Sequence, residues 1–246
     1  QEEYMRELLI DGDIVLYHIA TACEKEIDWG DDLWTLHSDS AEAQGKLNDY
    51  MSSLLNTLDA DIMTVALSSN KNFRKEIFPE YKLNRKKRRK PLAMNPLRDY
   101  FSEKYSTVVY DRLEADDGLG ILATEKSDNE RIIVSIDKDL KQIPGLLSSD
   151  GKTIKEVNKA QADYWFLIQT LAGDLTDGYS GCPGIGVKTA EKLLDIKVPL
   201  VDNWARVVKA YKKKDYLDGE ILQQARVARI LRHGEYDHTT GAVKLW

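Results

Sequence analysis

Residues 7–16 read ELLIDGDIVL, a short apolar run that contains two aspartates. A run of this kind predicts a buried first strand whose end carries carboxylates. Further β-rich stretches follow at residues 61–69, 106–110 and 131–136. Helical patterns at 41–58 and 115–126 alternate with these stretches. Alternating strands and helices indicate an α/β fold, with a mostly parallel sheet and helices on both faces.

The pattern changes near residue 158. The segment SSDG at 148–151 is a turn signal that predicts a hairpin, and from Ala160 onward the sequence predicts helices only. We therefore expect two domains, an α/β domain at residues 1–158 and an all-helical domain at 159–246.

Composition excludes several classes of protein. The 246 residues carry a net charge of −6, with 42% hydrophobic and 31% charged residues, which is typical of a soluble globular protein. Two cysteines, Cys23 and Cys182, are too few for a disulfide framework or a thiolate zinc site. The longest apolar runs fall short of the roughly 18 residues that a membrane span needs. We expect neither a disulfide scaffold nor a membrane protein.

Acidic residues recur where predicted strands end or predicted helices begin. They are Asp11, Asp13, Glu114, Asp116, Asp117, Asp137, Asp139, Asp174 and Asp177. Because the carboxyl ends of neighbouring parallel strands meet at one crevice, we expect these carboxylates to share a small volume. Two unit charges 4 Å apart repel by about 4 kcal/mol at an effective dielectric of 20, so protons or divalent cations must neutralise them. Oxygen ligands without a cysteine or histidine cluster favour Mg²⁺ or Mn²⁺ over zinc.

Basic residues are concentrated in one short segment. Residues 82–90 read KLNRKKRRK, with seven cations and no acid. A polyanion would relieve the repulsion among these cations, and the run therefore predicts contact with phosphates. A second basic cluster, at Arg206, Lys209 and 212–214, fits a solvated helix face equally well.

A glycine-rich hairpin occupies residues 178–194, GYSGCPGIGVKTAEKLL. Its glycines permit positive φ and close backbone approach, and the residues from Val187 onward continue as a helix. Backbone N–H groups at such a helix start can bind a phosphate. Gly-Ile-Gly followed by Lys188-Thr189 matches the helix–hairpin–helix pattern of sequence-independent DNA binding. An ordinary glycine-rich turn between two helices is the alternative.

A phosphatase is a rival hypothesis. The segment LLIDGDIV also fits the first motif of haloacid-dehalogenase-type phosphatases, with Asp11 as nucleophile and Asp13 as acid. The segment GDLTD at 173–177 resembles that family's later metal motif, but two residues separate its acids where three or four are usual. This hypothesis leaves the acids at 114–117 and the basic run without a role, and it ranks second.

Five segments resemble motifs of the flap endonuclease / 5′→3′ exonuclease superfamily, in the same order along the chain. They are LLIDGD (8–13), PEYKLNR (79–85), LEADD (113–117), SIDKDL (135–140) and GDLTDGYSGCPGIG (173–186). The likeness is greatest to the double-strand-specific 5′→3′ exonucleases of short-tailed coliphages. It implies a PIN-like α/β domain with a basic arch at 71–106, followed by a helix–three-turn–helix DNA-binding domain.

The resemblance also implies an activity and its partners. It implies hydrolysis of duplex DNA from 5′ ends with two Mg²⁺ or Mn²⁺ ions, and a K⁺ ion held by main-chain carbonyls of the glycine hairpin. Flaps and RNA/DNA hybrids are further substrates that it suggests. The expected setting is phage DNA replication or degradation by a monomer in the cytoplasm of the infected bacterial host.

Site residues carry over by motif. For the first metal the resemblance implies Asp11, Glu114 and Asp116; for the second it implies Asp137, Asp139, Asp174 and Asp177, with Asp117 beside them. Lys82 and Arg85 would contact the scissile phosphate, and Tyr81 would stack near the terminal base. The remaining DNA contacts would come from Lys86, Lys87, Arg88, Arg89 and Lys90 of the arch and from Gly181, Gly184, Gly186, Lys188 and Thr189 of the hairpin.

The chain departs from the family pattern at one position. The second strand of these enzymes normally ends in an aspartate ligand, whereas LSSN at 67–70 places Ser69 there. The first metal site would be weaker as a result. A catalytically impaired DNA-binding homologue is therefore a third hypothesis.

Overall fold

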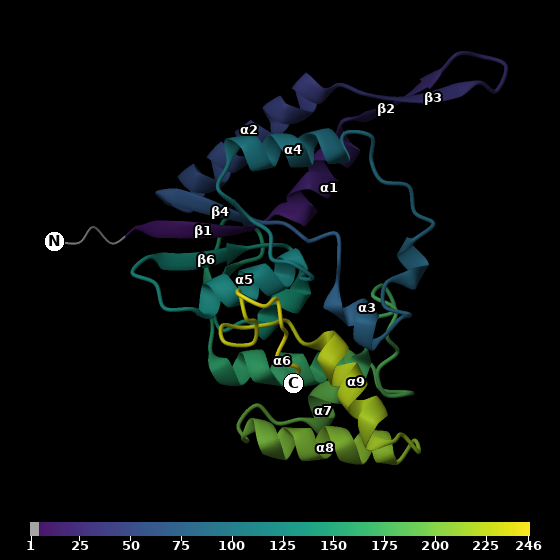
Figure 1. The fold of residues 1–246 in the computed structure, drawn as a ribbon, viewed down its shortest axis with the longest axis vertical. Helices are drawn as coiled ribbons and strands as arrows, with labels where there is room; N and C mark the ends of the chain where they lie inside the picture. Colours follow the sequence, from purple (N-terminus) through teal and green to yellow (C-terminus); the bar gives the residue numbers. More distant parts are fainter. Residues whose placement is uncertain (1–4) are drawn as a thin grey trace.

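The computed structural model describes residues 5–246, in which a six-stranded sheet forms the centre (Figure 1). In sheet order the strands are β5 (Thr107–Val108), β4 (Ile62–Ala66), β1 (Arg6–Asp11), β6 (Glu130–Val134), β7 (Gly145–Ser148) and β8 (Lys155–Val157). Neighbouring strands run parallel, except that β8 is antiparallel to β7. The predicted mostly parallel sheet and the predicted hairpin at 148–151 are confirmed.

Strand β1 lies inside the sheet because its side chains are apolar on both faces. Leu8, Leu9 and Ile10 are fully buried. Leu9 pairs with Thr64 of β4 on one side and with Ile133 of β6 on the other. A continuous apolar run is typical of a parallel strand that is covered on both faces.

The first strand is shorter than predicted. The expected strand at 7–16 ends at Asp11, and helix α1 (Gly12–Ala22) follows directly. The Asp11 carboxylate caps this helix by accepting a hydrogen bond from the Ile14 N–H at 3.2 Å. Gly12 allows the sharp turn, because a Cβ there would lie 2.6 Å from two neighbouring side chains. Apolar residues continue on both sides of Asp11, Gly12 and Asp13, and therefore hydrophobicity alone did not show that a helix begins there.

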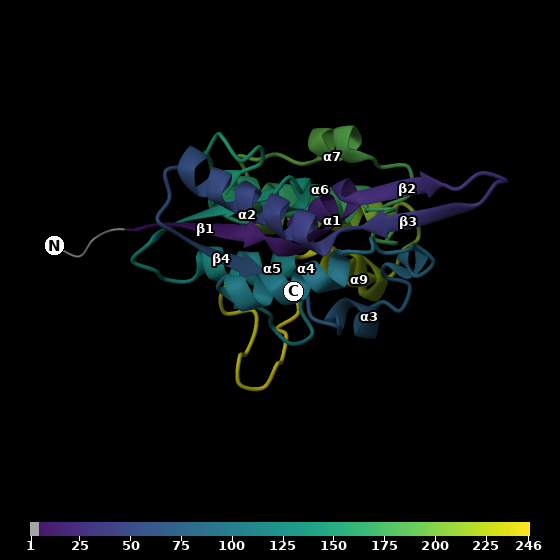
Figure 2. The same ribbon diagram turned by 90° about the horizontal axis from the view of Figure 1, so that it is seen from above.

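Helices cover both faces of the sheet, as predicted (Figures 1 and 2). Helices α1, α2 (Ser40–Thr57) and α4 (Met94–Lys104) pack on one face against Leu8 and Ile10. Helix α5 (Ala115–Thr124) and the 3₁₀ helix η2 (Lys138–Gln142) pack on the other face, against Leu9. Side chains that alternate between the faces of β1 thus anchor both helical layers.

The segment predicted as an arch connects β4 to β5. It contains α3 (Phe73–Ile77), the 3₁₀ helix η1 (Leu83–Arg85) and α4. Figure 1 shows the chain leaving the sheet, passing α3 beside α9 and returning to α4 on the opposite face. This route carries the basic run across the carboxyl ends of the strands.

A two-stranded hairpin was not predicted. Strands β2 (Glu24–Asp28) and β3 (Trp34–Ser38) pair antiparallel and project away from the body of the molecule (Figures 1 and 2). Both strands are largely exposed. Neither strand has a buried face, so the alternation that marks a strand in a sequence is missing.

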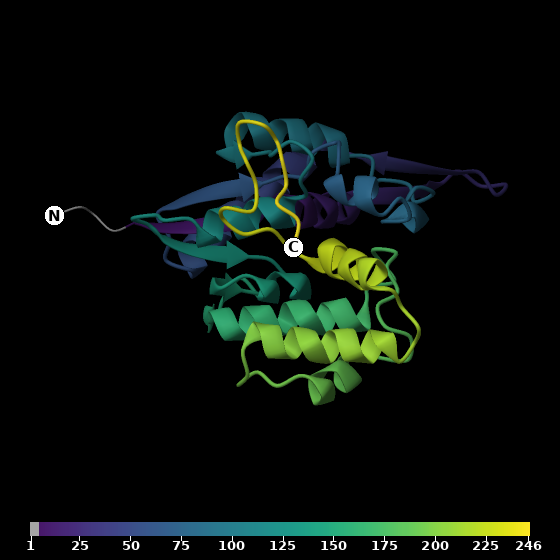
Figure 3. The same ribbon diagram turned by 60° about the horizontal axis from the view of Figure 1, so that its bottom comes forward.

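Four helices follow the sheet within the described chain (Figure 3). They are α6 (Lys159–Ala172), α7 (Val187–Leu193), α8 (Leu200–Lys212) and α9 (Asp218–Ala228). They share a core of their own, in which Phe166, Tyr211 and Ile221 are buried. The change to helices only near residue 158 is confirmed.

The end of the chain returns to the α/β layer. Helix α9 ends at Ala228, and Ile230 and Leu231 then pack beside α5. The division into domains at residue 158 stays a prediction. Within residues 5–246, none of the helices is both long enough and apolar enough to cross a bilayer.

Candidate active site

An open acidic cavity of about 390 Å³ lies at the carboxyl ends of β1 and β6. Strand β1 has β4 on one side and β6 on the other, so the chain reverses its strand order here, where α/β sheets bind ligands. The acids that line the cavity are Asp11, Asp13, Glu114, Asp116, Asp137, Asp139, Asp174 and Asp177. Seven of these eight are predicted metal ligands, and the fold brings them together from four separate stretches of chain.

Several of these carboxylates are oriented by their position at the start of a helix. Asp11 caps α1 and Asp137 caps η2, where its carboxylate accepts a hydrogen bond from the Asp139 N–H at 2.8 Å. Glu114 occupies the N-cap position of α5, and Asp116 lies in the first turn of that helix. Acids are favoured at helix N-termini, because the helix dipole is positive there.

A tight turn after α6 supplies the last two acids. The Asp174 carbonyl accepts hydrogen bonds from the N–H groups of Asp177 and Gly178 at 3.1 and 2.9 Å. Gly173 has φ 67°, and a Cβ there would lie 2.3 Å from the Ser180 backbone. Only glycine fits, and the helical layer thereby contributes directly to the cavity.

Burial and mutual repulsion shift the pKa values of several acids in the cavity. Burial, reinforced by the charges of Asp13 and Asp137, raises the pKa of Asp11 to about 7 although Ser135 and Ile14 donate hydrogen bonds to it. Burial and the same kind of repulsion raise the pKa of Asp116 well above its usual value and that of Asp139 to about 6. Such crowding indicates a site that a cation would stabilise.

Three cations also line the cavity within the described residues. Lys82 Nζ lies 2.5 Å from Glu114 and 3.7 Å from Asp177, and Arg85 lies 2.5 Å from Asp177. Lys138 lies 3.0 Å from Asp139 and 3.3 Å from Asp174. Burial acts to raise the pKa of Glu114, but Lys82 and neighbouring donors outweigh it and lower that pKa to about 2. The predicted phosphate-contacting residues are thus held beside the acids.

The donor set fits magnesium or manganese. Carboxylates outnumber cations in the cavity, and neither cysteine nor histidine lines it. In the described part of the chain, no three His, Cys, Asp or Glu side chains are grouped closely enough to hold an ion by themselves. Mg²⁺ keeps several of its waters and is usually bound through one or two carboxylates, so a roomy acidic cavity suits it.

Asp117 was predicted as a metal ligand, but it does not line the cavity. Its carboxylate is fully buried and accepts hydrogen bonds from two Arg74 nitrogens, both at 2.7 Å. It also accepts hydrogen bonds from the backbone N–H groups of Glu114 and Leu231. The adjacent position, Asp116, faces the cavity because the two side chains point in different directions from the first turn of α5.

Tyr81 was predicted to stack on a base, and the structure contradicts this. Its side chain is buried, and its hydroxyl donates a hydrogen bond to Glu114 at 2.7 Å and lies 3.1 Å from Asp177. Tyr81 therefore orients two cavity carboxylates. The apolar surroundings of its ring, in the core of the helical layer, leave no face for stacking.

The serine that replaces the expected acid is Ser68, not Ser69. Ser68 lines the cavity, and its N–H lies 3.2 Å from the Asp13 carboxylate. The N–H of Ser69 instead donates to the carbonyl of Leu113. Strand β4 ends at Ala66, and this boundary determines which serine reaches the cavity.

Some cavity residues were missed by motif comparison. Asp13 was counted among the acids but not among the metal ligands, and Arg98 lies 3.3 Å from it. Lys138 belongs to the SIDKDL motif, where its charge between two acids was the available signal.

The basic run divides into parts with different partners. Lys82 and Arg85 enter the cavity, whereas Lys86, Lys87, Arg88 and Lys90 are exposed. Arg89 instead pairs with Glu24 of β2, through contacts of 2.7 and 2.8 Å. All six predicted DNA contacts of the run, Arg85 to Lys90, are therefore exposed, and Arg89 also forms a surface ion pair.

The glycine hairpin divides in the same way. Gly181 is buried, and its N–H donates to the Gln224 side chain at 3.0 Å, so it cannot meet a DNA backbone as predicted. Gly184 and Gly186 have open space where a side chain would be, and Lys188 and Thr189 are exposed beside them. These four residues keep their predicted surface position.

Known proteins are similar to this chain in sequence and in fold. A family model described as "5′-3′ exonuclease, N-terminal resolvase-like domain" matches residues 6–163. The exodeoxyribonuclease of Enterobacteria phage T3 and the exonuclease of Escherichia phage T7 are each 30% identical to the chain, over 97% of this chain and 92% of theirs. The flap endonuclease of bacteriophage T5, solved as a pseudo-enzyme-product complex with DNA and metal ions, matches 91% of this chain and 93% of that chain with a TM-score of 0.59 at 16% identity. The likeness confirms the PIN-like α/β fold. The chain therefore belongs to the 5′-3′ exonuclease family.

Proposed function

We propose that this 5′-3′ nuclease is a divalent-metal-dependent exonuclease that degrades duplex DNA from its 5′ ends. The observation that carries the proposal is the convergence of carboxylates from β1, β6, α5 and the turn after α6 on one cavity that also contains Lys82 and Arg85. The matches to the phage T3 and T7 nucleases support the same activity.

The residues of the chain divide the work of hydrolysis. Asp11, Asp116 and Asp137 are placed to hold Mg²⁺ or Mn²⁺, with Asp139 and Asp174 nearby. When bound, two such ions lower the pKa of the attacking water and offset charge on the leaving oxygen. Water forms a new bond to phosphorus, the bond from phosphorus to the 3′ oxygen breaks, and the products carry a 5′-phosphate and a 3′-hydroxyl.

Lys82 and Arg85 neutralise the phosphate oxygens in this proposal. Both cations lie against Glu114 and Asp177 at the cavity edge, where a phosphate could exchange with a carboxylate. Lys82 has φ 54°, an unfavourable conformation for a non-glycine residue, and its N–H donates to the Asp177 carbonyl at 2.7 Å. This constrained backbone supports a role for Lys82 in positioning the phosphate.

The DNA outside the cavity would be held by charge and by backbone. Lys86, Lys87 and Arg88 would attract the 5′ end, and the exposed hairpin around Gly184 and Gly186 would hold the duplex. A K⁺ ion at the hairpin, and flaps or RNA/DNA hybrids as further substrates, belong to the same proposal. Relatives from phages support a role in phage DNA replication or degradation. That the protein acts as a monomer in the cytoplasm of an infected bacterium is part of the same proposal.

An end-labelled duplex assay tests the proposal. With Mg²⁺ or Mn²⁺, the wild type should release 5′-phosphorylated nucleotides, and Asp137→Ala should abolish release while binding of duplex in Ca²⁺ survives. Full turnover by Asp137→Ala would refute the metal-site account. Turnover of a small phosphomonoester through a phosphorylated Asp11 would support the phosphatase hypothesis, and binding without any release would support an impaired homologue.

A further inference from the structure

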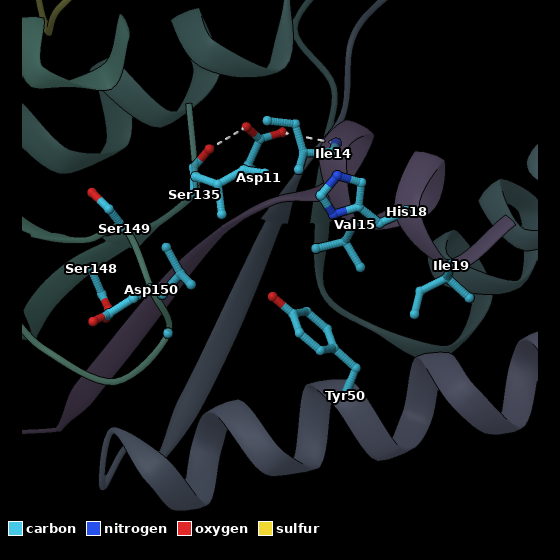
Figure 4. A pocket seen from close by; sticks show the side chains of 13 residues that line it. Asp11, Ile14, Val15, His18, Ile19, Tyr50, Ser135, Ser148, Ser149 and Asp150 are labelled. Atoms are coloured by element: carbon cyan, nitrogen blue, oxygen red, sulfur yellow. Dashed lines mark hydrogen bonds between the residues drawn. The ribbon is translucent and has the colours of Figure 1, made fainter. Parts of the chain in front are cut away.

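A second cavity lies behind Asp11 (Figure 4). It has a volume of about 100 Å³ and opens between α1, Tyr50 of α2, the end of β6 and the turn at 148–151. Asp11 and Ile14 line both this cavity and the acidic cavity. The two cavities are therefore neighbours that share one wall, and a nucleotide whose phosphate lies at the acids can reach this second cavity.

The lining combines apolar walls, aromatic rings and a polar end. Val15, Ile19, Val134 and Ile136 form apolar walls, and Ile136 is 57% exposed. In Figure 4 the Tyr50 ring extends from α2 into the opening, and the His18 ring lies on the neighbouring side. The polar groups at the far end come from Ser148, Ser149 and Asp150.

This chemistry selects a flat ring rather than a phosphate. The carboxylate of Asp150, at the polar end, repels an anion. An apolar cavity of roughly 150 Å³ takes a single benzene ring. This cavity, at about 100 Å³, is smaller but opens to solvent, so one planar ring can enter it in part and remain partly outside. A nucleobase offers a face to stack on Tyr50 and His18 and amino groups that can donate to serine or carboxylate oxygens.

The position of the cavity indicates which base it would take. The exposed glycine hairpin belongs to the helical layer, whereas α1 and α2 cover the opposite side of the sheet (Figures 1 and 3). A duplex held by the helical layer would reach the acids first, and its last nucleotide would then extend past Asp11, which lines both cavities, toward α1 and Tyr50.

We propose that this cavity binds the base of the 5′-terminal nucleotide and so measures off one nucleotide for release. This inference rests on the proposed 5′ exonuclease function. It makes Tyr50 and His18, which line the cavity together with Asp11, specificity-determining residues that contact the substrate.

The test compares duplexes that carry a reduced abasic residue at nucleotide 1, at nucleotide 2 or nowhere. For the wild type, kcat/KM should be about tenfold lower with the abasic residue at nucleotide 1, on the scale of one lost stacking contact. Loss at nucleotide 2 should have little effect. In Tyr50→Ala, the kcat/KM values of the intact duplex and of the duplex abasic at nucleotide 1 should become nearly equal. In Tyr50→Phe, the tenfold difference should remain because the ring remains. Trp29→Ala removes an exposed ring on the distant β2–β3 loop and is the matched control.

A binding measurement separates this inference from the proposed function. A 2-aminopurine base at the 5′ terminus should change its fluorescence on binding to the wild type in Ca²⁺, and Tyr50→Ala should abolish the change without abolishing binding. An unchanged difference between these two duplexes in Tyr50→Ala, or an abasic penalty at nucleotide 2 instead of nucleotide 1, would overturn the inference while leaving the exonuclease intact. Absence of any duplex hydrolysis together with an intact fluorescence change would overturn the proposed function and leave the base site standing.

Discussion

The Arg74 guanidinium forms a buried two-point ion pair with the Asp117 carboxylate, with both N–O distances at 2.7 Å. The same guanidinium donates to the carbonyls of Val227 in α9 and of Arg229, so the pair joins α3, α5 and the end of α9. Glu114, at the start of α5, lies 3.4 Å from Arg74. One ion pair thus connects the arch, the acidic cavity and the end of the chain.

Breaking this pair should destabilise the protein strongly. Arg74→Met leaves Asp117 buried without its partner, and we expect the free energy of unfolding to fall by about 3–5 kcal/mol in urea titrations. The double variant Arg74→Met/Asp117→Leu should recover part of the loss. Glu76→Gln removes the exposed partner of Arg112 and should cost no more than about 1 kcal/mol. Equal losses from the buried and exposed pairs would contradict this view.

The Tyr81 hydroxyl should affect kcat and its dependence on Mg²⁺ more than it affects DNA binding. Tyr81→Phe removes the donor to Glu114 and should reduce kcat about tenfold or more, while duplex affinity in Ca²⁺ changes little. The dependence of rate on Mg²⁺ concentration should shift to higher values. Tyr100→Phe, whose hydroxyl bonds lie outside the cavity, is the control. An unchanged kcat and an unchanged Mg²⁺ dependence in Tyr81→Phe would show that the hydroxyl does not orient the cavity carboxylates.

The metal-free protein should become less stable as the pH rises toward neutrality. Asp11, with a pKa of about 7, keeps a proton in the folded state that the unfolded chain releases near pH 4. The free energy of unfolding should therefore fall as pH rises from about 4 to about 7. Asp11→Asn should flatten this decline, as measured by urea unfolding in EDTA, and should be the more stable protein at pH 8. Parallel curves for wild type and variant would show that Asp11 does not titrate in this range.

Exposed cations of the arch should set the salt dependence of DNA binding. Replacing Lys86 and Lys87 by Gln should reduce the slope of log affinity against log salt by about 2. Replacing Lys126 and Lys244, which are exposed outside the arch, should leave the slope unchanged. Identical slopes for both double variants would mean that the arch cations do not touch phosphates.

The two serines after β4 should respond differently to an added carboxylate. Ser68→Asp places a further acid in the cavity and should lower the Mg²⁺ concentration needed for half-maximal rate, by about tenfold. Ser69→Asp should have little effect, because the backbone of Ser69 bonds to Leu113 outside the cavity. The rate of each variant is measured as a function of Mg²⁺ concentration. A stronger effect at position 69 would mean that Ser69, and not Ser68, faces the metal site.

The sequence by itself determined the α/β class, the change to helices near residue 158 and most of the acids of the cavity. Apolar runs report burial, and the strand-end acids at 11 and 137 follow from the rule that parallel strands end at one edge. The order of motifs along the chain then indicated the family.

Only the tertiary structure decided how neighbouring residues divide their roles. Asp116 and Asp117 are adjacent and chemically identical, yet one lines the cavity and the other pairs with Arg74, because the direction of a side chain depends on where the helix begins. The same holds for Ser68 and Ser69, and for Arg89, whose partner Glu24 lies 65 residues away. Such pairings arise from contacts between distant parts of the chain, so local patterns of residue types cannot predict them.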